Sequence, residues 1–162
     1  MTVEVGDKLP EATLFKREDG DIREFNTQTL AAGRRLVIVG VPGAFTPTCS
    51  EKHLPGFLAN ADYILEAGVD EIFCVAVNDP FVMEAWGESQ GVQGAVTLLS
   101  DGNGEFTQAL GLERDMSKAG LGMRSKRYAM VVENGRVELL KVDESGMKAS
   151  AAEVVLEYLT GG

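Results

Sequence analysis

Short apolar runs alternate with amphipathic segments along most of this chain. Residues 35–41, 69–77 and 96–100 are mainly apolar, as in strands that are buried on both faces of a sheet. Between them, residues 57–65 and 80–90 repeat apolar side chains at helical spacing. This alternation predicts an α/β fold in which α-helices flank a central β-sheet.

Turn signals divide the remaining segments. Residues 18–21 predict a turn after an extended N-terminal segment, and the Asn-Gly pair at 134–135 predicts a type I′ hairpin between two alternating runs. Pro55 lies inside a helical pattern and should kink that helix or start a new one. A final helix is predicted over residues 149–159, whereas residues 111–125 show no clear period and are expected to be irregular.

The composition supports one domain with a substantial core. The chain has 162 residues, 44% of them hydrophobic, and no repeat or linker-like stretch, so we expect residues 1–162 to form a single domain. The formal net charge is −10, which excludes the basic surface that nucleic acids and anionic membranes require. No apolar run reaches the roughly 20 residues of a membrane span. We therefore expect neither nucleic acid nor membrane as a partner.

The N-terminus and the cysteine count indicate a compartment. The first seven residues contain neither the basic nor the apolar region of a targeting peptide, which favours a cytoplasmic location. A presequence that has been removed would give the same pattern. Two cysteines are too few for a disulfide framework and fit a reducing compartment.

Cys49 is the strongest candidate for chemistry. It follows the apolar run 35–41 and precedes a segment with helical character, so it should lie in the first turn of a helix. There, the helix dipole and unpaired backbone N–H groups favour the thiolate, which is the nucleophilic form. The hydroxyl of Thr46, three residues earlier, can hydrogen-bond either the sulfur or its reaction partner. The pattern predicts an activated nucleophile.

The residues around Cys49 resemble the active-site motif of the peroxiredoxins. Residues 42–49 read Pro-Gly-Ala-Phe-Thr-Pro-Thr-Cys, and residues 53–57 read His-Leu-Pro-Gly-Phe. Together they are similar to the atypical subfamily called type II in plants and type V in animals, and residues 120–128 also fit it. The resemblance covers almost the whole chain. It implies a thioredoxin-like fold with a mixed central sheet, and a thiol peroxidase activity.

This resemblance also implies a role for each matching residue. Cys49 would attack hydrogen peroxide or an alkyl hydroperoxide and become a sulfenic acid. Arg127 would supply the cation that stabilises the thiolate and the leaving oxygen, and Thr46 a hydrogen-bonding hydroxyl. Pro42 would shield the sulfenic acid from solvent. We expect no cofactor, and one histidine with two scattered cysteines is too small a set for a zinc site.

His53 has two interpretations. It lies four residues after Cys49, so a continuous helix would bring both to one face, and the pair would be a nucleophile with its general base. The resemblance favours another interpretation, in which His53 orders the active-site loop by hydrogen bonding. We expect His53 to support the site without transferring a proton.

Cys74 also has two interpretations. Its strand is rich in apolar residues, which favours a buried core cysteine. Alternatively, it is a resolving cysteine that forms a disulfide with Cys49, which requires Cα atoms within about 7 Å or local unfolding. Residues 148–162 contain no cysteine, so the reductant should be an external thiol. The resemblance implies glutathione or glutaredoxin first, and thioredoxin as an alternative.

Further alternatives concern assembly and function. The resemblance implies a homodimer formed through loops around the active site. Four aromatic residues could line a collar for organic peroxides or belong to the core or the dimer interface: Phe45, Phe57, Phe81 and Trp86.

Two functions compete with the peroxidase. One is a redox sensor or chaperone-like binding protein switched by Cys49 oxidation. The other is a disulfide oxidoreductase, which normally needs a second cysteine where this chain has Thr46.

Overall fold

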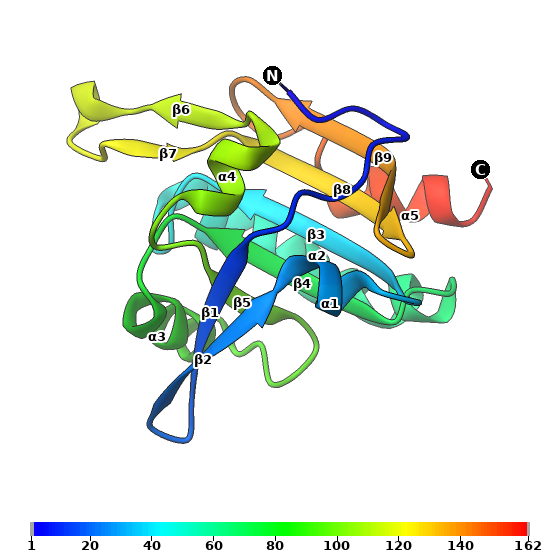
Figure 1. Cartoon of the computed structure of the whole chain (residues 1–162), viewed down its shortest axis with the longest axis horizontal. Helices are drawn as coiled ribbons and strands as arrows, with labels where there is room; N and C mark the ends of the chain where they lie inside the picture. The colour runs from blue at the N-terminus through cyan, green and yellow to red at the C-terminus, as the bar shows by residue number, and fades with distance from the viewer. Residues whose placement is uncertain (1, 162) are drawn as a thin grey trace.

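A seven-stranded mixed sheet forms the centre of the computed structural model, which describes residues 2–161 (Figure 1). Its strands are β1 (Thr13–Glu18), β2 (Asp21–Asn26), β3 (Arg35–Val41), β4 (Glu71–Ala76), β5 (Thr97–Ser100), β8 (Arg127–Glu133) and β9 (Arg136–Asp143). They are ordered β2-β1-β5-β4-β3-β8-β9. The central strands β3, β4 and β5 are parallel, and the flanking pairs are antiparallel. The predicted mixed sheet is confirmed.

Helices cover both faces of this sheet. They are α1 (Thr27–Ala31), α2 (Leu54–Glu66), α3 (Pro80–Gln90), α4 (Glu105–Leu110) and α5 (Ala152–Leu159). Side chains from α2, α3 and α5 pack against one face, and those of α1 and α4 pack against the other. Successive residues of β3 alternate between these two clusters, as the period of a strand requires. The strand therefore reads as a continuous apolar run because both of its faces are buried.

A short ribbon stands apart from the main sheet. Its strands are β6 (Glu113–Asp115) and β7 (Met123–Ser125), joined through the 3₁₀ turn η2 (Ser117–Ala119). It projects beyond the start of β8, at the upper left of Figure 1. The expectation that residues 111–125 are irregular was wrong in this respect. Each strand has only three residues, too few for a periodic pattern to be visible in the sequence.

The chain changes its helical geometry at Cys49. Helical structure starts at residues 47–48, passes through the π-helical turn η1 (Cys49–His53) and continues as α2. Pro55 has no N–H to donate to a carbonyl four residues earlier. The N–H of Leu54 instead bonds the Cys49 carbonyl five residues back, which is the hydrogen bond of a π-turn. The expected new helix at Pro55 is confirmed, with the proline in its first turn.

The remaining predictions agree with the structure to within two residues, except at the start of the last helix. The turn near residues 18–21 joins β1 to β2, and the Asn-Gly pair joins β8 to β9. The last helix begins at Ala152, three residues later than predicted, because the N–H groups of residues 148–150 bond the Asp143 carboxylate. No helix among residues 2–161 is long and apolar enough to cross a membrane.

Candidate active site

Cys49 lies in the first turn of a helix, at the carboxyl end of strand β3. Its side chain is fully buried, with no exposed surface. Because the helix starts at residue 47, the backbone N–H of Cys49 is among the first few that no helical carbonyl can accept. The sulfur accepts a hydrogen bond from Arg127 Nη2 at 3.3 Å. The predicted position of Cys49 in the fold is confirmed, and a cation faces its sulfur.

Arg127 reaches Cys49 from the neighbouring strand. It is the first residue of β8, and its successor Tyr128 pairs with Gly40 near the end of β3. This register places Arg127 beside the point where the chain leaves β3 for the Cys49 loop. Its side chain is only 7% exposed, so its attraction for a negative sulfur is weakly screened by water. The guanidinium therefore places a buried positive charge within hydrogen-bond distance of the Cys49 sulfur.

His53 binds the other side of the guanidinium. Its Nδ1 lies 3.0 Å from Arg127 Nη1, and its Nε2 lies 2.9 Å from the carbonyl oxygen of Ser150. A carbonyl can only accept, so Nε2 carries the proton and Nδ1 accepts from Arg127. Burial lowers the pKa of His53 to about 4, and the charge of Arg127 acts in the same direction against the bond to Ser150. His53 is neutral near pH 7, and Arg127 occupies the lone pair that a general base would need.

Asp143 organises the loop that supplies the Ser150 carbonyl. Its carboxylate accepts backbone N–H bonds from Lys148, Ala149 and Ser150 and a hydroxyl bond from Ser150. Burial alone would raise the pKa of Asp143, but these donors outweigh it and lower the pKa to about 2. Asp143 was not among the predicted site residues. An aspartate before a loop that contains Ser145 and Gly146 predicts a turn, but it does not indicate which groups the carboxylate will bind.

The loop before Cys49 is held in an unusual conformation. Thr46 Oγ1 donates to the Gly43 carbonyl at 2.6 Å, so its hydrogen is directed to the backbone. The N–H of Ala44 donates to Asn78 Oδ1 at 2.9 Å, a second contact that the sequence did not reveal. Between these anchors, Phe45 has a φ of 63°, which is strained for a bulky residue. The loop keeps this geometry because hydrogen bonds fix it on both sides.

A pocket of about 270 Å³ opens above this arrangement. Pro42, Thr46 and Arg127 line it, and Cys49 lies behind them. Pro42 itself is buried. The structure thus brings together Cys49, Arg127 and His53, and Pro42 and Thr46 line the same pocket as Arg127. Among residues 2–161, no group of three or more histidine, cysteine or acidic side chains could hold a metal ion.

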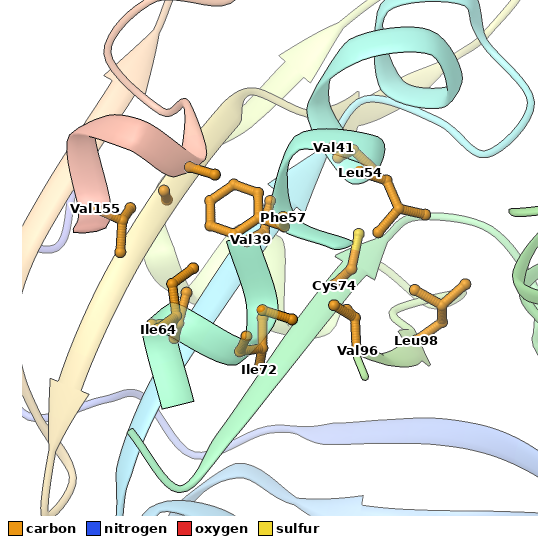
Figure 2. Close-up of a cluster of buried hydrophobic side chains, with 14 of the residues drawn as sticks. Val39, Val41, Leu54, Phe57, Ile64, Ile72, Cys74, Val96, Leu98 and Val155 are labelled. Carbon is orange, nitrogen blue, oxygen red and sulfur yellow. The ribbon is translucent and has the colours of Figure 1, made fainter. Parts of the chain in front are cut away.

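Cys74 lies apart from the pocket, in the middle of β4. It is fully buried among apolar side chains, as Figure 2 shows. Burial, and after it the charge of Cys49, raises the pKa of the Cys74 thiol well above its ordinary value. Both cysteines are free in this structure. These surroundings fit the interpretation of Cys74 as a core residue, since a thiol held in the neutral form is a poor nucleophile.

The four aromatic residues divide into two pairs. Trp86 and Phe57 are fully buried, and Trp86 Nε1 donates to the hydroxyl of Ser50, the residue after Cys49. Phe45 and Phe81 are more than half exposed, at 54% and 58%. The interpretation as core residues therefore holds for the first pair. In the second pair, Phe45 belongs to the loop before Cys49, whereas Phe81 at the start of α3 lies under the Arg17 guanidinium.

Comparisons with known proteins agree on one family. A family model described as redoxin matches residues 4–156. The protein Peroxiredoxin-2E-2, chloroplastic, from Oryza sativa subsp. japonica is 52% identical, over 98% of this chain and 73% of the relative. Peroxiredoxin-2D from Arabidopsis thaliana is 43% identical, over 97% of this chain and 98% of the relative. The crystal structure of reduced Prx3 in complex with hydrogen peroxide from Vibrio vulnificus is 44% identical, with a TM-score of 0.94, and covers 98% of this chain and 99% of that chain.

Replacing Arg127 should slow the reaction of Cys49 with peroxide. We expect Arg127→Gln to lower the rate constant for oxidation of Cys49 by hydrogen peroxide by about tenfold, because a buried charge-assisted hydrogen bond to the sulfur is lost. Stopped-flow mixing of the reduced protein with hydrogen peroxide measures this rate, with Cys49→Ser as the blank. Arg136→Gln removes an equal charge at the opposite end of β8 and β9 and serves as the control. Equal rate constants in both variants would assign the effect to another group.

His53 should make the folded protein less stable in acid. The unfolded chain binds a proton at His53 near pH 6.5, whereas the folded chain resists it down to about pH 4. The stability contributed by neutral, buried His53 is therefore present above pH 6.5 and lost as the pH falls towards 4, by up to about 3 kcal/mol. Below pH 3.8, Asp143 adds a further loss in the same direction.

Urea unfolding of the wild type and of His53→Gln at a series of pH values measures this effect. Glutamine can accept from Arg127 and donate to Ser150 without gaining a proton. We expect the free energy of unfolding of the variant not to fall between pH 6.5 and 4. The variant should still lose stability below pH 3.8, through Asp143. Parallel curves for the two proteins would contradict the assignment to His53.

Proposed function

The chain belongs to the peroxiredoxin family of thiol peroxidases, and from this premise we propose that Cys49 is the residue at which it reduces peroxides. The proposed substrates are hydrogen peroxide and alkyl hydroperoxides. The observation that carries the proposal is the 3.3 Å contact between the Cys49 sulfur and the Arg127 guanidinium. It supplies a cation at the point where both the thiolate and the breaking O–O bond need one.

The reaction is a displacement at oxygen. An electron pair of the Cys49 thiolate attacks one peroxide oxygen, and the pair of the O–O bond moves to the other oxygen. That oxygen takes a proton and leaves as water or an alcohol, while Cys49 becomes a sulfenic acid. Sulfur is oxidised by two electrons and the peroxide is reduced by two. Arg127 stabilises the thiolate first and then the negative charge on the leaving oxygen.

The other residues orient these groups. Thr46 has given its hydrogen to the Gly43 carbonyl, so its oxygen can accept the O–H of a peroxide and align the molecule. His53 accepts from Arg127 and keeps one edge of the guanidinium turned away from the sulfur. Pro42 lines the pocket and limits solvent at the nascent sulfenic acid. In this proposal His53 is a positioning residue and transfers no proton.

We propose that an external thiol recycles the enzyme. A first thiol displaces water from the sulfenic acid and forms a mixed disulfide with Cys49, and a second thiol releases Cys49 as the thiol with formation of a free disulfide. The burial of Cys74 and the absence of cysteine from residues 148–162 argue against an internal resolving step. Glutathione or glutaredoxin is the favoured reductant, and thioredoxin is the alternative.

Two further features complete the proposal. The exposed side chains of Phe45, in the loop before Cys49, and of Phe81, at the start of α3, support a homodimer formed through these loops. The free thiols support a reducing compartment. The cytoplasmic location stays a prediction, since two relatives are named as chloroplastic.

Cys49→Ser should abolish peroxide consumption, whereas Cys74→Ser should keep most of it. Steady-state turnover with hydrogen peroxide and an external thiol measures the rate. Intact-mass spectrometry with a sulfenic-acid trap then locates the oxidised residue, and we expect the adduct on Cys49. Turnover in the Cys49 variant would overturn the proposal, and a Cys49–Cys74 disulfide would overturn the external resolving step. Oxidation of Cys49 without turnover would favour the redox sensor.

Asn78 should act as a positioning residue for the loop. Asn78→Ala removes the acceptor for the Ala44 N–H, so the strained loop should relax and misalign Thr46. We expect the rate of Cys49 oxidation by hydrogen peroxide to fall about tenfold, since small displacements of orienting groups have effects of this order. Asn78→Asp keeps an acceptor oxygen and should restore most of the rate. An equal loss in both variants, at unchanged urea midpoints, would exclude this role.

A further inference from the structure

The pocket above Cys49 is larger than the smallest substrate requires. Its volume is about 270 Å³, close to the lower limit of about 300 Å³ for pockets that bind small organic ligands. A hydrogen peroxide molecule is only slightly larger than a water molecule, whose share of liquid volume is about 30 Å³. One wall comes from the ribbon of β6 and β7, through Arg114, Met116 and Leu121. The space therefore fits a molecule larger than hydrogen peroxide but far smaller than a protein domain.

The ribbon places two arginines directly opposite each other. Arg114 of β6 and Arg124 of β7 are partners in the antiparallel register. Their side chains thus leave the same face of the ribbon, where opposed like charges are destabilising. Among residues 2–161, neither arginine forms an ion pair, although the chain carries a formal net charge of −10. A ribbon that keeps this repulsion without a counter-charge indicates an anionic ligand.

Both arginines are close to the reaction site. Arg114 lines the same pocket as Arg127 and Thr46. The Arg124 guanidinium borders the Cys49 loop, since a Cβ placed on Gly43 would lie 3.1 Å from its Nη1. Arg124 Nε donates to the Leu121 carbonyl, which fixes the direction of this side chain.

The acidic residues nearby do not neutralise this pair. Asp143, the acid that lines the pocket, already accepts four hydrogen bonds from its own loop. Asp115 accepts the N–H of Ser117. Glu113 precedes Arg114 in the strand, so its side chain leaves the opposite face.

We propose that Arg114 and Arg124 bind a carboxylate of the small thiol that reduces Cys49, a thiol peptide of the glutathione class. This inference rests on the proposed function and names the ligand chemistry of its second half-reaction. Arginine binds carboxylates with two parallel hydrogen bonds, which fixes the direction of the ligand as well as its position. The carboxylate is held at the ribbon while the thiol sulfur reaches the Cys49 sulfenic acid. The mixed disulfide forms with its peptide part in the pocket, and water leaves.

Steady-state kinetics with a matched pair of thiols tests this inference. Glutathione and its diethyl ester share one thiol, but only glutathione carries carboxylates. We expect the ratio of kcat/KM for glutathione to kcat/KM for the ester to fall about tenfold in an Arg114→Gln, Arg124→Gln double variant. The control double variant, Lys8→Gln with Arg136→Gln, removes the same charge at the far end of β9 and should keep the wild-type ratio. An equal ratio in all three proteins would overturn the inference.

Two further measurements separate the alternatives. Single-turnover oxidation of the reduced protein by hydrogen peroxide and by a carboxylate-bearing hydroperoxide locates the half-reaction that uses the arginines. A loss confined to the carboxylate-bearing peroxide would assign the site to the peroxide and overturn the role in thiol binding.

Binding of S-methylglutathione to the Cys49→Ser protein involves no turnover. We expect its Kd to rise when both arginines are replaced, and an unchanged Kd would overturn the inference even if the peroxidase proposal holds. Failure of the wild type to consume peroxide with any thiol would instead overturn the proposed function.

Discussion

The arrangement of the site depends on the two hydrogen bonds of the Arg127 guanidinium. One of its nitrogens faces the Cys49 sulfur and another faces His53. A buried cation of this kind is costly unless its donors are satisfied and a negative charge lies nearby. His53 satisfies one edge near pH 7, where its ring is neutral. The other edge donates to the Cys49 sulfur.

The position of the Arg127 guanidinium also depends on the loop of residues 148–150, which does not contact the sulfur. His53 presents a bare Nδ1 to Arg127 because its Nε2 proton is given to the Ser150 carbonyl. That carbonyl has its position because Asp143 gathers the N–H groups of residues 148–150. A carboxylate at the end of β9 thus sets the tautomer of a histidine and, through it, the direction of an arginine. The sequence separates these groups widely, and only the sheet brings them together.

More of the fold than of the site could be predicted from the sequence. Buried strands, the Asn-Gly hairpin and the helix start at Pro55 follow from local patterns, because each depends on residues close in the chain. Cys49 could be located from the same kind of evidence, and Arg127 and Thr46 from the resemblance to a family. Asp143 and Asn78 could not be found, because each binds backbone groups of another segment, and backbone groups are the same in every residue. The π-turn was not predicted, because Pro55 predicts a break in the helix but does not specify which carbonyl the preceding N–H groups will bond.

Local rules are broken where the chemistry is proposed. Phe45 occupies the left-handed region, η1 lengthens the helical turn at Cys49, and Arg114 faces Arg124 across the ribbon. The backbone of Phe45 is strained, and the opposed arginines repel each other. The first two features shape the loop that presents the sulfur. The third concerns charge, and a charge repulsion is relieved by a counter-ion rather than by a change of shape. In this acidic protein, an anionic ligand in the pocket that Arg114 lines would supply that counter-ion.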